Sequence, residues 1–195
     1  MIIDNIDIWR IAIGDSLTQC KDTWTSRGFP VNHFEAITPD TMPTNELIFT
    51  EKHNRKYTKT HAPFSDVEKA IFYSHYALWK KCHTTNRPIT VIEHDTKLIG
   101  NFPALWDVRR LKYFCVGHRA LRNDGLYDTK YSPAAGYVLT PLGAEVLLKN
   151  TTGKNICWNV DHYIRIYRDP NSPSWAIRYA EQYERDYDRA SIHLK

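Results

Sequence analysis

The chain has 195 residues, of which 42% are hydrophobic and 25% charged, so its composition excludes a disordered protein and its size predicts a single domain over 1–195. No run approaches the roughly 18 consecutive apolar residues of a membrane span, and the amino terminus lacks a signal peptide, so we expect a cytoplasmic location. The net charge of +4 fits a phosphate-bearing partner but does not require one.

The first part of the chain predicts a strand, a helix and a second strand. Residues 6–13 begin with alternating and end with apolar side chains, which predicts a strand, and 31–37 predict the next one. Residues 17–27 predict a helix with Ser16 or Asp15 as its cap. Because such units pair their strands in parallel, the pattern favours an α/β fold.

A long polar segment, residues 38–63, follows and concentrates positive charge. Its basic side chains include Lys52, Arg55, Lys56 and Lys59. Cations this close together can bind phosphate groups or a nucleic-acid backbone, so we expect these four residues to contact phosphates or the acceptor. A solvated loop is the alternative of equal weight.

Residues 65–81 predict a helix that starts with a capping box from Ser65 to Glu68. The predicted buried stripe comprises Val67, Ala70, Ile71, Ser74 and Leu78, and the adjoining face carries Phe72, His75 and Trp79. Ser74 and His75 are the polar members of these faces. Taken alone, both are compatible with ordinary hydrogen-bonded core positions.

The stretch with the clearest chemical content is 89–95. Its first four residues predict a short buried strand, which ends at Glu93, His94 and Asp95. Ligands of open α/β sheets bind at the carboxyl ends of strands, and acidic groups there need a counter-charge such as a divalent metal ion. In an ideal strand Glu93 and Asp95 point to one face and His94 to the other, so we expect both carboxylates to line one site, with Asp95 exposed at its rim. The alternative is a strand that runs into a polar turn.

The second half of the chain continues the alternation of strands and helices. We expect a short helical piece at 104–106, strands at 112–116 and 134–139, a polar loop at 118–131, a helix over 142–149 started by Thr140 and Pro141, an extended segment at 156–162, a helix or strand at 163–167, and a helical tail from 174.

Four segments, in order, resemble the signature of family 25 glycosyltransferases, the group of the lipooligosaccharide and collagen galactosyltransferases. They are Phe72–Trp79 with its serine–histidine pair, Val91–Asp95 with its acidic end, Ala135–Leu148 with its Gly-Tyr strand and Gly-Ala helix, and Val160–Asp161. The resemblance spans residues 8–165 and implies a GT-A-like, Rossmann-type α/β fold, a mixed and mainly parallel sheet flanked by helices. It implies a metal-dependent, inverting enzyme that moves a hexose from a UDP-sugar to a hydroxyl acceptor. His94 departs from the family, which has an aspartate there.

The resemblance also implies roles for single residues. Asp161 would be the base that deprotonates the acceptor hydroxyl. The donor-binding residues would be Ser74, His75, Glu93 and Gly136, and the metal ligands would be Glu93 and Asp95, with His162 as a further one. Mn²⁺ or Mg²⁺ suits such ligands and would clamp the diphosphate as the glycosidic bond breaks. The alternative roles are a capping Asp161 and a surface His162.

The sequence leaves the acceptor open. One option is a saccharide, as in lipooligosaccharide synthesis, and the other is 5-hydroxymethylcytosine in DNA, as in viral DNA-glucosylating enzymes that act in a host cytoplasm. The basic residues at 52–59 and 109–122 favour DNA. One rival class is a non-catalytic carbohydrate- or nucleic-acid-binding module on the same fold, which the departure at His94 supports. Another is a zinc hydrolase, which the lack of HxxxH or HExxH spacing disfavours.

Overall fold

The computed structural model describes residues 2–4, 6–52, 62–98, 105–107, 114–116, 136–167 and 180–182. The helices are α1 (Thr18–Thr25), α2 (Asp66–Thr85), α3 (Pro141–Thr151) and α4 (Val160–Tyr167). The strands are β1 (Ile2–Asp4), β2 (Asp7–Ala12), β3 (Val31–Glu35), β4 (Ile48–Phe49), β5 (Ile89–Glu93), β6 (Thr96–Leu98), β7 (Leu105–Asp107), β8 (Phe114–Val116), β9 (Gly136–Leu139), β10 (Asn155–Ile156) and β11 (Ala180–Gln182).

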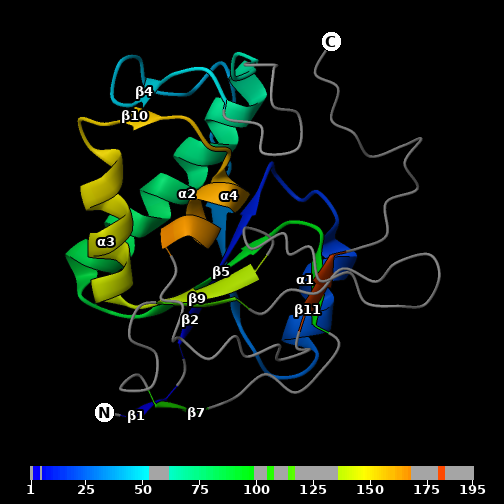
Figure 1. Ribbon diagram of the computed structural model, residues 1–195. Coiled ribbons are helices and arrows are strands. Elements are labelled where there is room, and N and C mark those ends of the chain that lie inside the picture. Colours follow the sequence, from blue (N-terminus) through cyan, green and yellow to red (C-terminus); the bar gives the residue numbers. More distant parts are fainter. Residues whose placement is uncertain are drawn as a thin grey trace, which may run out of the picture.

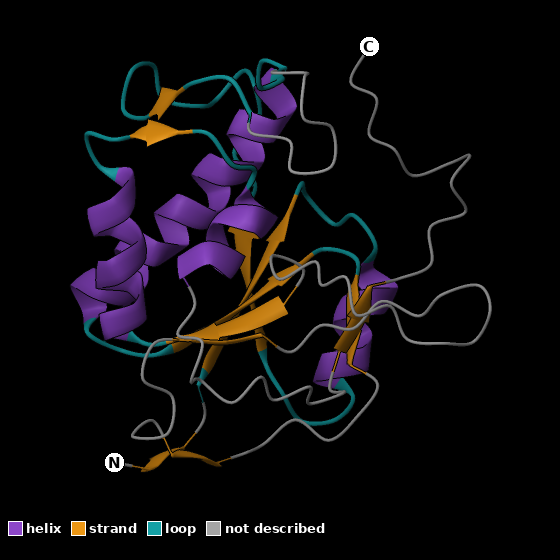
Figure 2. Ribbon diagram, viewed as in Figure 1, coloured by secondary structure: helices purple, strands orange, loops and turns teal. Residues whose placement is uncertain are grey.

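A five-stranded sheet with the order β3-β2-β5-β9-β8 forms the centre of the molecule (Figure 2). β3 and β5 pair with β2 in parallel, whereas β9 pairs antiparallel with both β5 and β8. All strands except β9 therefore run in the same direction within this sheet. This arrangement confirms the predicted mixed, mainly parallel α/β sheet, and the predicted strand at 89–92 is its buried central strand.

Helices cover both faces of the sheet (Figure 1): α2, α3 and α4 lie on one face, and α1 lies with β6 on the other. The core on the α2 face is built around Trp79 and Tyr137, and the core on the α1 face around Trp24 and Ile92. Because parallel crossovers are right-handed, the connection from β2 to β3 and the return from β3 to β5 place their helices on opposite faces.

The starts of α2 and α3 agree with the sequence. Ser65 Oγ accepts a hydrogen bond from the Glu68 amide at 3.2 Å, and the Glu68 carboxylate accepts one from the Ser65 amide at 2.9 Å, which completes the predicted capping box. Thr140 Oγ1 accepts from the Gly143 amide at 3.1 Å, with a proline at the first helical position. These local signals are reliable because capping satisfies amides that a helix leaves without partners.

The start of α1 differs from the prediction. Neither Ser16 nor Asp15 caps it; Leu17 is the cap residue, in a left-handed conformation with φ 50°, and no side chain bonds to the first turn. The Ser16 carbonyl instead accepts a hydrogen bond from the Arg10 guanidinium. A tertiary contact from β2 therefore shapes this turn, and sequence capping rules do not include it.

The buried face of α2 also differs from the predicted stripe, because Val67 and Ile71 are each 41% exposed. The helix turns its aromatic side inward, and the rings of Phe72 and Trp79 lie 5.1 and 5.7 Å from the ring of Tyr163 in α4. Aromatic rings bury more area than branched aliphatic side chains, so they decide which face packs against the core.

Two short segments predicted as helical are strands. Residues 105–107 form β7, which pairs antiparallel with β1, and residues 180–182 form β11, which pairs antiparallel with β6. Pairing with a distant segment overrides local helix preference in such short runs. The predicted loop at 118–131 lies outside the described residues. Within the described ranges, no helix combines the length and apolar character needed to cross a bilayer.

Candidate active site

The carboxyl end of β2 is the point where the chain changes direction across the sheet. β3 lies on one side of β2 and β5 on the other, and their helices α1 and α2 cover opposite faces. In open α/β sheets the ligand crevice forms at such a switch point. Glu93 stands at this edge because it ends β5, level with Ile11 of β2. The predicted carboxylate therefore lies where this architecture places ligands.

Glu93 faces α2. Its Oε1 lies 3.6 Å from Nε2 of His75, and 22% of its side chain is exposed. The His75 ring is fully buried and lies 5.8 Å from the Tyr137 ring in a stacked arrangement. Two of the predicted donor-binding residues, Glu93 and His75, are thus brought together. Glu93 keeps an exposed surface with which it can contact a ligand.

The hydroxyl of Ser74, the neighbour of His75, forms its hydrogen bonds with backbone groups. Its Oγ donates to the Ala70 carbonyl at 3.0 Å and accepts from the Ile37 amide at 2.9 Å, and the residue is 1% exposed. Ile37 follows β3, so Ser74 fixes the segment that leaves this strand against α2. A donor-binding role for Ser74 stays a prediction, and this geometry supports an indirect one.

Asp95 is not the exposed rim carboxylate that the sequence predicts, because it is 0% exposed. It lies in the turn between β5 and β6, where its charge helps to raise the pKa of Cys20 to about 11, the larger cause being burial of that thiol. Its charge also acts on Arg10, which is 2% exposed. Burial lowers the pKa of Arg10, and Cys20, Asp15, Asp22 and Asp95 oppose that effect.

The prediction that Glu93 and Asp95 point to one face is therefore wrong. Glu93 faces His75 on α2, whereas Asp95 lies near Cys20 on α1, on the other side of the sheet. The physical reason is that the strand ends at Glu93 and the chain turns at 94–95, so strict alternation stops.

The residues that are described do not assemble a metal centre. In these ranges no three histidine, cysteine, aspartate or glutamate side chains gather closely enough to hold an ion. The separation of Glu93 from Asp95 is one reason, since the pair does not form a chelate. Mn²⁺ or Mg²⁺ binding stays a prediction.

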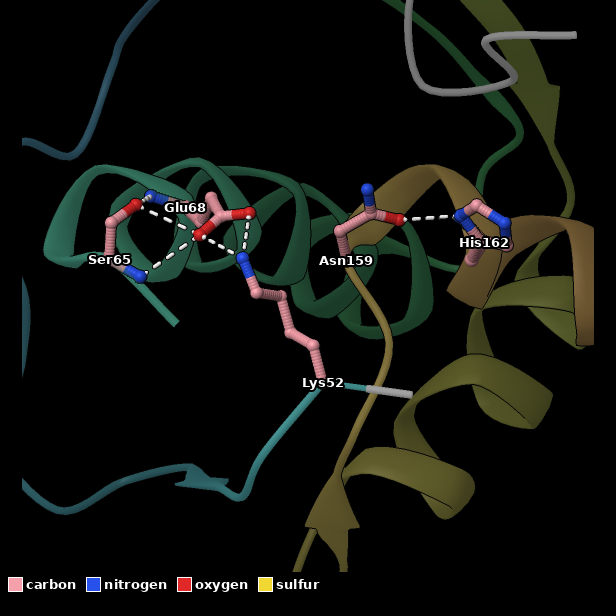
Figure 3. A network of polar contacts seen from close by, with 5 residues as sticks. All are labelled: Lys52, Ser65, Glu68, Asn159 and His162. Atoms are coloured by element: carbon pink, nitrogen blue, oxygen red, sulfur yellow. Dashed lines mark hydrogen bonds and ion pairs between the residues drawn. The ribbon is translucent and has the colours of Figure 1, made fainter. Parts of the chain in front are cut away.

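Asp161 and His162 lie in the first turn of α4. Asn159 occupies the cap position: its Oδ1 accepts from the His162 amide at 3.1 Å and lies 2.9 Å from His162 Nδ1 (Figure 3). The His162 ring also stacks on Trp158 at 5.7 Å. Because Asn159 caps the helix, the alternative that Asp161 is the cap is wrong. The predicted roles of Asp161 as base and His162 as metal ligand stay predictions.

Gly136 starts β9 opposite Ile92. A Cβ added there would lie 3.6 Å from Thr96 Cγ2 and 3.8 Å from Ile92 Cγ2, which is ordinary van der Waals contact. The protein part of the site therefore does not require glycine at this position. Its predicted donor-binding role rests on the resemblance alone.

Lys52 takes part in the start of α2. Its Nζ lies 2.8 and 2.9 Å from the two carboxylate oxygens of Glu68, the capping-box acid (Figure 3). The phosphate- or acceptor-binding role predicted for Lys52 would have to break this ion pair. The other three members of the basic stretch, Arg55, Lys56 and Lys59, lie outside the described residues.

Replacing Glu68 by glutamine should reduce stability in a pH-dependent way. Burial raises the pKa of Glu68, but hydrogen bonds from Lys52 and Ser65 outweigh it and hold that pKa below its usual range. A lowered folded-state pKa stabilises the protein above the unfolded pKa, and the contribution disappears as the pH falls through the folded value. Urea unfolding should show a wild-type advantage of up to about 1 kcal/mol at pH 7 that shrinks below about pH 4.5. An advantage that grows in acid would contradict this assignment.

A cavity of about 140 Å³ opens between the β2–α1 turn and edge strand β3. Its lining combines charged and polar groups with backbone: Arg10, Gly14, Asp15, Lys21, Val31, Asn32 and His33. Sequence reasoning missed these residues, and it also missed Tyr137 and Trp79 beside His75. The sequence signal that could have indicated this cavity is Arg10, a charged residue within an otherwise mostly apolar strand pattern.

Fold and site together define a Rossmann-like α/β domain with a carboxylate at the switch point of its sheet. Comparison with known sequences gives the family. The family description "Glycosyltransferase family 25 (LPS biosynthesis protein)" matches residues 16–132, which is more than half of the chain. The chain belongs to glycosyltransferase family 25.

Relatives with known names agree. The chain is 33% identical over 79 residues to the lacto-N-neotetraose biosynthesis glycosyltransferase LgtE of Neisseria gonorrhoeae, and the match covers 40% of this chain and 27% of that protein. It is 32% identical over 77 residues to the lipooligosaccharide biosynthesis protein lic2B of Haemophilus influenzae, with the same shares covered. The match thus spans about a quarter of the length of these relatives.

Proposed function

We propose that this glycosyltransferase moves a hexose from a UDP-sugar to a hydroxyl group of a saccharide. Family membership supports sugar transfer, and the observation that carries the site assignment is Glu93, a partly exposed carboxylate at the carboxyl end of β5. A carboxylate there can accept hydrogen bonds from sugar hydroxyls or hold a cation beside the diphosphate.

The proposed acceptor follows from the relatives and from Lys52. The relatives are named for lacto-N-neotetraose and lipooligosaccharide biosynthesis, which are saccharide products. The DNA alternative depended on the basic residues at 52–59 and 109–122, of which Lys52 is paired with Glu68 and the others lie outside the described residues. The names of the relatives therefore favour a saccharide, and 5-hydroxymethylcytosine becomes one arm of the test.

A transfer assay tests the proposal. Purified protein with a panel of UDP-sugars is offered simple oligosaccharides, duplex DNA with and without 5-hydroxymethylcytosine, or no acceptor, and products are read by mass spectrometry. We expect a hexose-sized mass gain on an oligosaccharide. A hexose-sized mass gain on the modified base would show that the acceptor is DNA and not a saccharide. No turnover of the UDP-sugar in any arm would favour the non-catalytic binding module. Parallel reactions with Mn²⁺, Mg²⁺ or EDTA test the metal requirement.

Replacing Asp161 by asparagine should abolish transfer while donor binding is retained. We propose Asp161 as the base, in the first turn of α4, and an inverting transfer needs a group that takes the acceptor proton. An asparagine cannot take it, so kcat should fall by about 100-fold or more. Binding of the UDP-sugar is measured by calorimetry. Replacing Asn159 by alanine is the control for loss of helix structure, since it removes the cap without touching the carboxylate. An unchanged rate in the Asp161 variant would remove this residue as the base.

A further inference from the structure

A chain of three buried side chains leads from α2 and β9 to Glu93. Trp79 Nε1 donates to Tyr137 Oη at 2.8 Å, Tyr137 Oη lies 3.0 Å from His75 Nδ1, and His75 Nε2 lies 3.6 Å from Glu93 Oε1. Trp79, Tyr137 and His75 are each 0% exposed. No bulk water reaches these groups, and His75 Nε2 is a buried nitrogen without a hydrogen bond among the described residues, because its 3.6 Å separation from Glu93 is longer than one.

The donors and acceptors in this chain fix where the imidazole proton lies. Burial raises the pKa of Tyr137, so its hydroxyl keeps its proton. The Trp79 indole is a donor only, and it already supplies a hydrogen bond to Tyr137 Oη. His75 Nδ1 is the acceptor that lies within reach of the Tyr137 hydroxyl proton, and this geometry assigns Nδ1 as the unprotonated nitrogen of the ring. The ring proton is then on Nε2, the nitrogen that faces Glu93.

We propose that Trp79 and Tyr137 are positioning residues that hold the neutral His75 ring with its Nε2–H directed at Glu93, and thereby orient this carboxylate toward the sugar donor. The inference rests on the proposed function, in which Glu93 contacts the donor. Glu93 is 22% exposed and ends a strand. Without an N–H group beside it, its carboxylate would move among several solvent-facing rotamers. Stacking of His75 on Tyr137, with 25° between the ring planes, restricts the imidazole in the same way.

The decisive measurement is the tautomer of His75 by long-range ¹H–¹⁵N correlation spectroscopy of histidine-labelled protein, which needs no substrate. In wild-type protein we expect the proton on Nε2 and an Nδ1 signal typical of a hydrogen-bonded acceptor. In the Tyr137→Phe variant the Nδ1 signal should move to that of a nitrogen without a donor, and the Glu93 carboxyl ¹³C signal should move with it. A wild-type proton on Nδ1, or a Glu93 signal unchanged in the variant, would overturn the proposal.

The kinetic arm uses a matched control. Tyr137→Phe should lower kcat roughly 10-fold, the usual effect of losing a group that orients a site residue, with the donor KM changed less than about two-fold. The control is Tyr163→Phe, which removes another buried hydroxyl from a ring that also stacks on Trp79. This hydroxyl lies 2.8 Å from Thr151 Oγ1. The control should leave kcat within about two-fold of wild type. Equal losses in the two variants would mean that Tyr137 acts only through stability.

Two further variants cover a Tyr137→Phe protein that does not fold. Trp79→Phe keeps an aromatic ring but removes the indole donor, and it should shift the same His75 and Glu93 signals by a smaller amount. His75→Gln keeps an N–H donor toward Glu93 and should retain more activity than His75→Leu, which has none. If wild-type protein transfers no sugar at all, the proposed function fails, whereas the spectroscopic result still decides the positioning inference.

Discussion

Sugar transfer by the Glu93→Gln variant is expected to be at least about 100-fold slower than by wild-type protein, with little loss of stability. Glutamine keeps the shape of the side chain and its place beside His75 Nε2, but it lacks the negative charge. Whether that charge accepts hydrogen bonds from the sugar or holds a cation beside the diphosphate, the amide replaces it poorly. The measurement is kcat and kcat/KM for the UDP-sugar found in the transfer assay.

The control for this variant is Glu46→Gln. Glu46 is also partly exposed, and it pairs with Lys80 at 2.6 Å on the surface, away from the switch point. Its replacement should change the free energy of unfolding by less than about 1 kcal/mol and leave transfer unaffected. A Glu93→Gln protein with wild-type kinetics would show that the strand-end carboxylate is not part of the active site, whatever the family of the protein.

The Asp95→Ala variant is expected to lose about 1 to 3 kcal/mol of unfolding free energy. Asp95 is 0% exposed, and its charge is one of four that act on the guanidinium of Arg10, which is itself 2% exposed. Truncating a buried polar side chain leaves its buried neighbours without a partner, which costs more than the loss of a surface contact. The measurement is urea unfolding at pH 7, followed by fluorescence of the tryptophans.

The structure offers a matched control in Asp15, which also interacts with Arg10 but is exposed. Asp15→Ala should cost less than about 1 kcal/mol. In an Arg10→Met background the Asp95→Ala substitution should cost clearly less than in wild type, because the two residues then no longer interact. An Asp95→Ala protein as stable as wild type would contradict the buried position of Asp95 and support the exposed rim position that the sequence predicts.

The sequence predicts the architecture well where local pattern and tertiary burial agree. The apolar run at 89–92, the capping box at Ser65 and the Thr140–Pro141 helix start all have local physical causes, and each is found in the fold. It fails where a distant contact decides. The turn before the left-handed Leu17 is bonded by Arg10 of β2 at the Ser16 carbonyl, and the strand at 105–107 pairs with β1.

The candidate site shows the same division. Glu93 could be proposed from the acidic end of a patterned strand, and His75 from the resemblance to the family, and the fold brings the two within 3.6 Å. The position of Asp95 could not be predicted, because alternation applies only within a strand and this strand ends two residues earlier. Tyr137 and Trp79 look like ordinary core aromatics until the hydroxyl and indole are seen to meet at His75.

The adjacent residues Ser74 and His75 set the positions of two different strand ends. Ser74 Oγ accepts a hydrogen bond from the amide of Ile37, just after β3, and His75 Nε2 faces the carboxylate at the end of β5. One turn of α2 thus contacts both the segment after β3 and the carboxylate at the end of β5. Each residue of an α-helix adds a rotation of about 100°, so an insertion or deletion between the capping box and Ser74 would turn both side chains away from their targets at once. The length of this part of α2 is therefore constrained by the site as well as by the core.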